Sequence, residues 1–160
     1  MTVEHTKRLT PHAVTWDDIL SGGWDALLVV GPDFSSLPEE YKAAIAAAKT
    51  TDASVGEQLS VVACDKAPGG RLVLAPTGPL DRDYDDVRRF YDAAREAVTR
   101  IAQTGAIQPV VMVTQVPTGT AWKNALALSF LGLQQGRYEP LEAREHFGND
   151  VEVFEALGVL

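Results

Sequence analysis

The chain has 160 residues and a formal net charge of −8, with 46% hydrophobic and 22% charged residues. These values are typical of one soluble globular domain. They argue against a nucleic-acid-binding protein, which needs a basic surface to neutralise phosphates, and no apolar stretch reaches the roughly 20 residues of a membrane span. The single cysteine, Cys64, cannot form an internal disulfide. It predicts a buried structural thiol and a reducing, cytoplasmic location.

The first part of the chain combines a polar arm, a helical turn and an apolar run. Residues 1–12 are polar and charged, and we interpret them as a frayed arm or a first edge strand. Thr15 can cap a short helix, with Asp17 and Asp18 at the positive end of its dipole. The apolar run within residues 25–31 is bounded by glycines, which predicts a strand covered on both faces.

The middle of the chain predicts a helix followed by a hairpin. Residues 38–49 are rich in alanine, and Pro38 suits the first helical position. Residues 59–64 and 71–75 are apolar runs typical of strands. The turn residues 65–70 lie between them, so we expect the two strands to pair as an antiparallel hairpin.

The second half predicts two helices and two strands. Residues 84–103 carry one apolar stripe at three- and four-residue steps, which predicts the longest helix. A buried strand is expected over residues 109–115, and a second helix over residues 120–134. Residues 138–146 have a less regular pattern that includes a possible helical turn. Residues 151–160 predict a final strand.

Strands and helices alternate along the whole chain, which favours a three-layer α/β/α sandwich with a mixed sheet. The expected hairpin supplies the antiparallel part of that sheet. We assign residues 1–160 to a single domain. The chain stops on the apolar Leu160, which we interpret as the mark of a domain trimmed from a longer protein.

No group of residues predicts a catalytic centre or a metal site. The acidic residues 81–86 have the spacing of a calcium loop, but Asp86 stands where that loop needs glycine. Acids in the first turn of the following helix are the favoured interpretation. The loops at Gly31, Gly78 and Gly119 offer backbone amides to an anion, although turn and cap roles are more common for such lone motifs. The three histidines are scattered and form no zinc motif.

A partner surface is better supported than a reactive site. The helix over residues 120–134 is apolar nearly all round, which is typical of a helix buried centrally or pressed against another domain or subunit. The residues that we expect to contact such a partner are Trp122, Leu126, Phe130, Val159 and Leu160.

Several segments together resemble one protein family. They are residues 71–77 (RLVLAPT), the helix of residues 85–102, the strand of residues 109–115 and residues 124–128 (NALAL). These segments resemble the N-terminal domain of the M17 leucyl aminopeptidases, and most closely the branch with a variant N-terminal domain. The similarity extends from about residue 25 to the final strand.

The resemblance implies a macro-like fold and a role without chemistry of its own. In this family, two divalent metals (zinc, manganese or magnesium) in a separate C-terminal domain activate the attacking water. The family's metal-binding motif, Asn-Thr-Asp-Ala-Glu-Gly-Arg-Leu, is absent here, so no catalytic, cofactor-binding or metal-binding role transfers to any residue of this chain. The expected partners are the chain's own catalytic domain and further copies in a homo-oligomer, with no nucleic acid and no membrane.

The sequence therefore predicts the non-catalytic N-terminal domain of a leucyl aminopeptidase that serves domain packing and oligomer assembly. One alternative is a stand-alone macro-type domain that binds ADP-ribose or a related nucleotide through amides near Gly31, Gly78 and Gly119. A small hydrolase is the least favoured alternative, because no nucleophile, base and orienting group are spaced for it.

Overall fold

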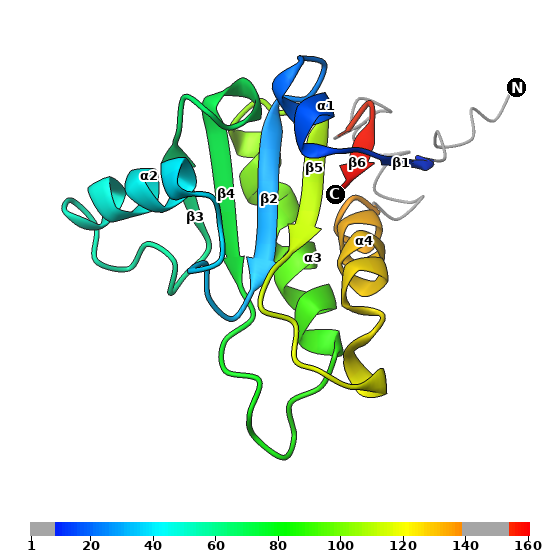
Figure 1. Ribbon diagram of the computed structural model, residues 1–160. Coiled ribbons are helices and arrows are strands. Elements are labelled where there is room, and N and C mark those ends of the chain that lie inside the picture. The colour runs from blue at the N-terminus through cyan, green and yellow to red at the C-terminus, as the bar shows by residue number, and fades with distance from the viewer. Residues whose placement is uncertain (1–8, 139–153) are drawn as a thin grey trace, which may run out of the picture.

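The structure, a computed structural model, describes residues 9–138 and 154–160. These residues form a six-stranded sheet with helices on both faces (Figure 1). The strands are β1 (Pro11–Ala13), β2 (Ala26–Gly31), β3 (Ser60–Ala63), β4 (Arg71–Pro76), β5 (Pro109–Val113) and β6 (Leu157–Val159). The helices are α1 (Trp16–Leu20), α2 (Glu39–Lys49), α3 (Arg88–Gln103) and α4 (Ala125–Gly136), with 3-10 turns η1 (Pro68–Gly70) and η2 (Thr120–Trp122). The predicted α/β/α sandwich with a mixed sheet is confirmed.

The strand order in the sheet is β1-β6-β5-β2-β4-β3. Every neighbouring pair is parallel except β3 and β4, which pair antiparallel with Ser60 opposite Leu74 and Ala63 opposite Arg71. The predicted hairpin is therefore confirmed. Strand β2 lies at the centre, with β4 on one side and β5 on the other, and all six of its residues are buried.

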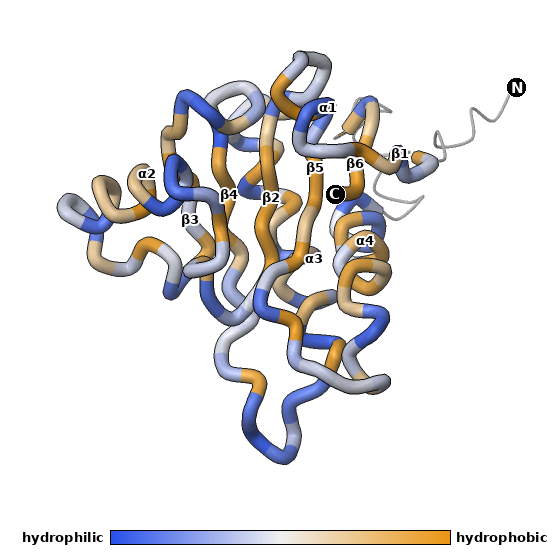
Figure 2. Tube along the Cα trace, in the orientation of Figure 1, coloured by the Kyte–Doolittle hydropathy of each residue, from blue (hydrophilic) through white to orange (hydrophobic). Residues whose placement is uncertain are grey.

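The sheet separates two apolar cores. Alternate residues of a strand point to opposite faces, so Leu28 of β2 packs with α3 and α4, whereas Leu27 packs on the side of α1 and α2. Figure 2 shows the hydrophobic colour concentrated along β2, β4 and β5 between these helices. In the described part of the chain, no helix is both long and apolar enough to cross a membrane.

Local sequence signals explain where the first helix begins. The Thr15 hydroxyl accepts a hydrogen bond from the Asp18 amide at 3.3 Å, and the Asp18 carboxylate accepts one from the Thr15 amide at 2.7 Å. This reciprocal pair is a capping box, which satisfies two amides that the helix leaves unbonded. The hydrogen bonds lower the pKa of Asp18, first through the Thr15 amide and then through its hydroxyl. The predicted cap is therefore confirmed.

Small residues bring α4 close to α3. A side chain at Gly132 would overlap the carbonyl oxygen of Tyr91, and one at Gly136 would come within 2.7 Å of the Arg95 carbonyl oxygen. Ser129 is fully buried on the same side of α4, and its hydroxyl donates to the Ala125 carbonyl oxygen at 2.9 Å. The backbones can approach only because these positions have little or no side chain.

One carboxylate ties together the beginnings of β2 and β5. The Asp25 side chain accepts hydrogen bonds from the amides of Ile107 and Gln108 at 2.7 and 2.9 Å. Its backbone carbonyl oxygen accepts a further bond from the Arg71 guanidinium at 3.1 Å. Asp25 thus connects three neighbouring strands at the edge opposite their carboxyl ends.

Several predicted boundaries differ from the structure. The expected helix over residues 120–134 is a 3-10 turn, Thr120–Trp122, followed by α4, which begins only at Ala125. Helix α3 begins at Arg88 rather than at residue 84, because the acidic residues before it form a loop. Pro38 is the residue before α2 rather than its first helical residue. The final strand occupies only Leu157–Val159. The prediction of a helical turn over residues 138–146 lies outside the described residues from 139 onward.

Candidate functional site

The carboxyl ends of the three central strands meet at one edge of the sheet. Strand β2 continues into a loop that leads to α2 on one face, whereas β4 and β5 continue toward α3 and α4 on the other face. In open α/β sheets, ligands bind where neighbouring connections leave the sheet in opposite directions. This edge is therefore the first place to look for a functional site. It gathers the predicted loops at Gly31, Gly78 and Gly119.

Two side-chain contacts close the space between the β2 and β5 loops. The hydroxyls of Ser36 and Thr114 are 2.6 Å apart and share a hydrogen bond. The side-chain amide of Gln115 donates to the Ser35 hydroxyl at 3.3 Å. The backbone φ of Gln115 is 51°, a value that residues other than glycine rarely adopt. A side chain at Gly31 would lie 2.6 Å from the Thr114 methyl carbon. The loops are packed directly against each other.

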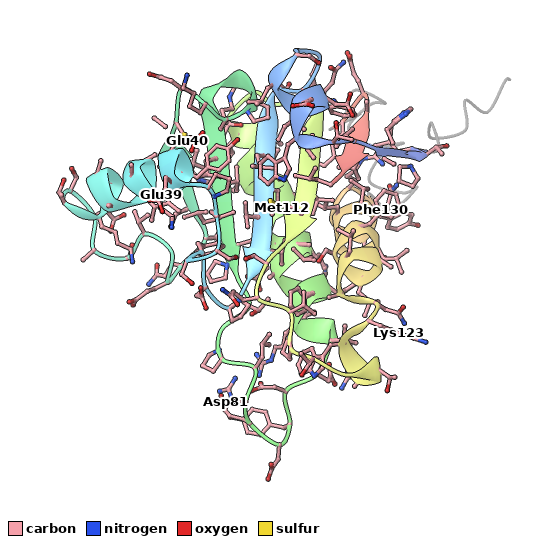
Figure 3. The ribbon with its side chains drawn as sticks, in the orientation of Figure 1. Glu39, Glu40, Asp81, Met112, Lys123 and Phe130 are labelled. Carbon is pink, nitrogen blue, oxygen red and sulfur yellow. The ribbon has the colours of Figure 1, made fainter. Side chains whose placement is uncertain are left out.

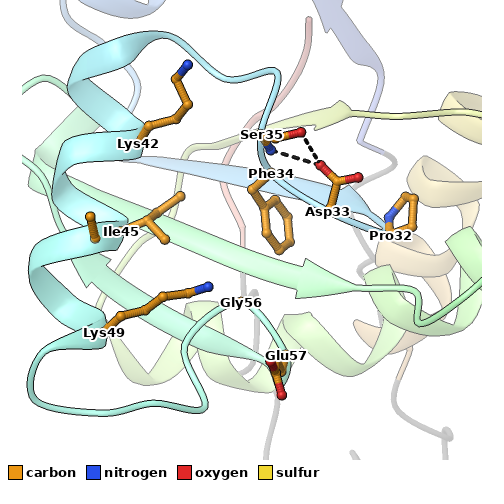
Figure 4. Close-up of a pocket in the computed structure, with 10 residues that line it drawn as sticks. Pro32, Asp33, Phe34, Ser35, Lys42, Ile45, Lys49, Gly56 and Glu57 are labelled. Atoms are coloured by element: carbon orange, nitrogen blue, oxygen red, sulfur yellow. Dashed lines mark hydrogen bonds between the residues drawn. The ribbon is translucent and has the colours of Figure 1, made fainter.

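An open hollow of about 540 Å³ lies beside the β2 loop, between that loop, α2 and residues 56–57 (Figure 4). Phe34 and Ile45 supply its apolar lining, and each is only 8% exposed. Lys42 and Lys49 project from α2, seven residues apart and therefore on one helix face. The hollow therefore combines an apolar lining with charges of both signs, because Asp33 and Glu57 also line it and Lys42 pairs with Glu39 at 2.6 Å.

One of the two acids that line this hollow, Asp33, is held in its ionised form. The Asp33 carboxylate accepts hydrogen bonds from the Ser35 hydroxyl at 2.6 Å and from the Ser35 amide at 2.9 Å. Both bonds favour the charged carboxylate and lower the pKa of Asp33, the hydroxyl more than the amide. A carboxylate of lowered pKa cannot serve as a general acid near neutral pH. Asp33 therefore orders the loop.

The acidic loop before α3 pairs with arginines. The Asp85 carboxylate accepts from Arg82 at 2.8 Å and lies 3.1 Å from Arg89, and its side chain is completely covered. Asp86 contacts Arg88 at 2.6 Å. The hydrogen bond from Arg82 is the main cause that lowers the pKa of Asp85. The expectation that acids occupy the first turn of the helix was wrong, since α3 begins after these pairs and has none there.

Four of the residues predicted to contact a partner lie on the face of the sheet that carries α4, whereas Leu160 lies on the opposite face. Phe130 projects from α4, as Figure 3 shows. Trp122 packs edge-on against Phe90, with ring centroids 6.4 Å apart. Leu126, Phe130 and Val159 are likewise partly buried against the α3–α4 core, and Leu160 against the other core. Their contact with a partner stays a prediction.

Other residues considered from the sequence are dispersed in the structure. Cys64 is buried, as predicted, at 6% exposure. His12 lies in β1 with its ring 6.3 Å from that of Trp24, whereas His5 and His146 fall outside the described residues. Within residues 9–138 and 154–160, no three His, Cys, Asp or Glu side chains are grouped to hold a metal ion.

Sequence reasoning missed the hollow, the exposed Leu131 of α4 and the exposed Tyr138 just after that helix. The spacing of Lys42 and Lys49 was the available signal for the hollow, but it gave no indication that Phe34 and Gly56 complete it. Leu131 is 51% exposed and Tyr138 is 64% exposed, although neither was chosen as a contact residue. The apolar character of the predicted 120–134 helix was the available indication that Leu131 could be exposed to a partner.

Comparison with known proteins supports the family resemblance. The chain is 37% identical over 78 residues, or 49% of its length, to a Caenorhabditis elegans protein named as a candidate aminopeptidase, and spans 14% of that protein. No family profile matches the chain. The fold is similar to part of a mutant tomato leucine aminopeptidase, with a TM-score of 0.67 and 15% identity over 98% of this chain and 34% of that one.

A second structural similarity is to the macrodomain of Thermus aquaticus DarG. Its TM-score is 0.49 at 14% identity, and the match covers 94% of this chain and 97% of the macrodomain. The similarity to an aminopeptidase sequence and the fold shared with part of a leucine aminopeptidase confirm the resemblance to an aminopeptidase domain that the apolar segments indicated. The chain spans 14% of the length of the Caenorhabditis elegans protein and 34% of the length of the tomato enzyme.

Proposed function

We propose that this chain is the non-catalytic N-terminal domain of an M17-type aminopeptidase and that it supports domain packing and oligomer assembly. The sequence similarity over 78 residues to an aminopeptidase carries this proposal. The shared fold supports it, because the chain corresponds to about a third of a leucine aminopeptidase. The two divalent metals and the water-activating residues would belong to the remaining part of such an enzyme.

The outer side of α4 supports the proposed packing role. Gly132, Gly136 and Ser129 face α3, while Ala127 and Leu131 on the other side are exposed. Burial of an exposed leucine against a partner is favourable by roughly 25 cal/mol for each Å² removed from water. A neighbouring domain or subunit would gain that energy by covering α4.

The catalytic part of the proposal is tested with the purified chain and leucine p-nitroanilide, in the presence of zinc, manganese or magnesium. We expect no hydrolysis above the rate of buffer with the same metal. Turnover that follows the protein through purification and is lost with a chelator would refute the proposal.

The packing part is tested in the protein that carries this domain. Leu131→Glu places a charge on the outer side of α4 and should weaken assembly in sedimentation velocity. Tyr84→Glu is the matched control, since Tyr84 is 68% exposed in the loop before α3. Equal sedimentation of both variants and the unmodified protein would contradict the role of α4.

A second candidate function is the binding of ADP-ribose or a related nucleotide. The observation in its favour is that the loops at Gly31, Gly78 and Gly119 all follow central strands at one sheet edge, where backbone amides can bind phosphate. The Ser36–Thr114 hydrogen bond weighs against it, because it fills the space between two of those loops. Isothermal titration with ADP-ribose distinguishes the two candidates, since saturable binding would favour this one.

A further inference from the structure

A second hollow, of about 690 Å³, lies on the face of the sheet opposite α3 and α4. It is bounded by α1, by the first turn of α2 and by the turn that joins β3 to η1. It is distinct from the hollow beside the β2 loop, which lies further along α2. None of the residues that we expect to contact a partner lines it.

Aromatic rings form one wall of this hollow. Trp16 of α1 stacks on Tyr41 of α2, with ring centroids 5.9 Å apart and an angle of 29° between the planes. The Tyr41 hydroxyl donates to the Lys66 carbonyl oxygen at 3.1 Å, which fixes the ring. Trp16 remains 37% exposed, and Trp24 also lines the space. An exposed indole face attracts a cation through the quadrupole of the ring.

The charges around the hollow favour a cation. Glu40 and Asp65 line it with exposed carboxylates, against the single ammonium of Lys66 among the described lining residues. Glu40 projects from the first turn of α2 (Figure 3). Burial is the main cause that raises the pKa of Tyr41, and the nearby Glu40 carboxylate adds to it. A cation in this hollow would contact aromatic rings as well as the carboxylates of Glu40 and Asp65.

The hollow also offers apolar contact beyond the charged groups. Ile19, Leu20 and Pro38 line it, and Leu20 is 61% exposed. A ligand that fits this combination has an aliphatic part, a planar cationic head and further apolar neighbours. Arginine meets all three conditions, because its guanidinium stacks on indole and donates paired hydrogen bonds to carboxylates.

We propose that the hollow between α1 and α2 binds an arginine side chain of a partner polypeptide, with the guanidinium against Trp16 and between Glu40 and Asp65. The partner is a polypeptide rather than a free cation, because the volume and the exposed Leu20 leave room for residues beside the arginine. This inference does not rest on the aminopeptidase proposal.

The test uses the ¹⁵N-labelled chain and the peptide acetyl-Ala-Leu-Arg-Leu-Ala-amide. The indole N–H signals of the three tryptophans report on both faces of the sheet, since Trp122 lies against the α3–α4 core. We expect the signals of Trp16 and Trp24 to shift in a saturable way and that of Trp122 to stay. The peptide with citrulline in place of arginine has the same shape without the charge, and it should not produce the shifts.

Variants distinguish binding at this hollow from nonspecific attraction of the cationic peptide to an acidic protein. Glu40→Gln with Asp65→Asn should weaken binding about fivefold, from the loss of two exposed ion pairs, and Trp16→Leu about threefold. The control Asp92→Asn with Glu96→Gln removes the same charge from α3 and should change affinity less than about twofold. The carboxylate variants change exposed side chains, so they keep the test valid if Trp16→Leu fails to fold.

Four outcomes would overturn the inference. They are the absence of saturable indole shifts at millimolar peptide, equal shifts with the citrulline peptide, equal weakening in the α3 control, and binding of arginine amide as tight as that of the peptide. The last result would show a small-cation site rather than a polypeptide site.

Discussion

Replacement of Asp25 tests how the central strands are held together. Its carboxylate accepts two backbone hydrogen bonds, from Ile107 at 2.7 Å and from Gln108 at 2.9 Å. Hydrogen bonds to a charged group contribute about 1.5–3 kcal/mol each. Ile107 is 40% exposed, so water can replace part of the lost bonding. We therefore expect Asp25→Ala to lower the free energy of unfolding by about 2 kcal/mol, below the simple sum.

Asp25→Asn gives a finer measure of the same contacts. Its NH2 group stands in place of one carboxylate oxygen and cannot accept, so one of the two amides loses its partner and we expect about half the loss, roughly 1 kcal/mol. The measurement is urea unfolding, monitored by circular dichroism. We expect the dependence of the unfolding free energy on urea concentration to be the same in all variants. For a chain of this size, the Asp25→Ala loss corresponds to a melting temperature lower by about 4–8 °C.

The control for Asp25 is Asp83→Ala, which removes an exposed aspartate from the loop before α3. It should change stability by less than about 0.5 kcal/mol. An Asp25→Ala protein as stable as this control would refute the reasoning. So would an Asp25→Asn protein that loses as much as Asp25→Ala, because the effect would then not follow the number of accepted bonds.

Two further predictions concern helix packing and acid stability. Gly132→Ala should destabilise the chain by about 1–3 kcal/mol although alanine favours helices, because the new carbon meets the Tyr91 carbonyl; thermal melting checks this, and a stabilised variant would contradict it. The lowered pKa of Asp85 stabilises the fold above its unfolded value, near 3.8, and this stabilisation is lost as pH falls through the folded value. Urea midpoints for Asp85→Asn should therefore fall less between pH 6 and pH 3 than those of the unmodified chain, and parallel curves would count against the pair.

The sequence was most informative where structure depends on neighbours along the chain. The hairpin of β3 and β4 followed from two apolar runs around a Gly/Pro turn, and the cap at Thr15 followed from a hydroxyl residue directly before a short helical pattern. The central position of β2 was visible as an uninterrupted apolar run, because a strand covered on both faces needs no polar side chain. Local signals of this kind are contained in short segments.

Features that depend on distant residues could not be predicted in the same way. The pairing of β1 with β6 joins residues more than 140 positions apart, and no local pattern specifies that register. Helix α3 begins late because Asp85 pairs with Arg82 and Arg89, while the Asp86 carboxylate accepts from the Arg88 amide at the start of the helix. The apolar stripe alone does not reveal this arrangement. The stacking of Trp16 on Tyr41 likewise requires α1 and α2 to pack on the same face.

The most direct test of the central claim is the hydrolysis of leucine p-nitroanilide by the purified 160-residue chain with added zinc, manganese or magnesium. Our account places the chemistry in polypeptide other than this domain. It therefore predicts that the hydrolysis rate equals that of the metal-containing buffer alone, whatever the concentration of the chain. A rate that rises in proportion to the concentration of the chain and disappears with chelator would contradict it.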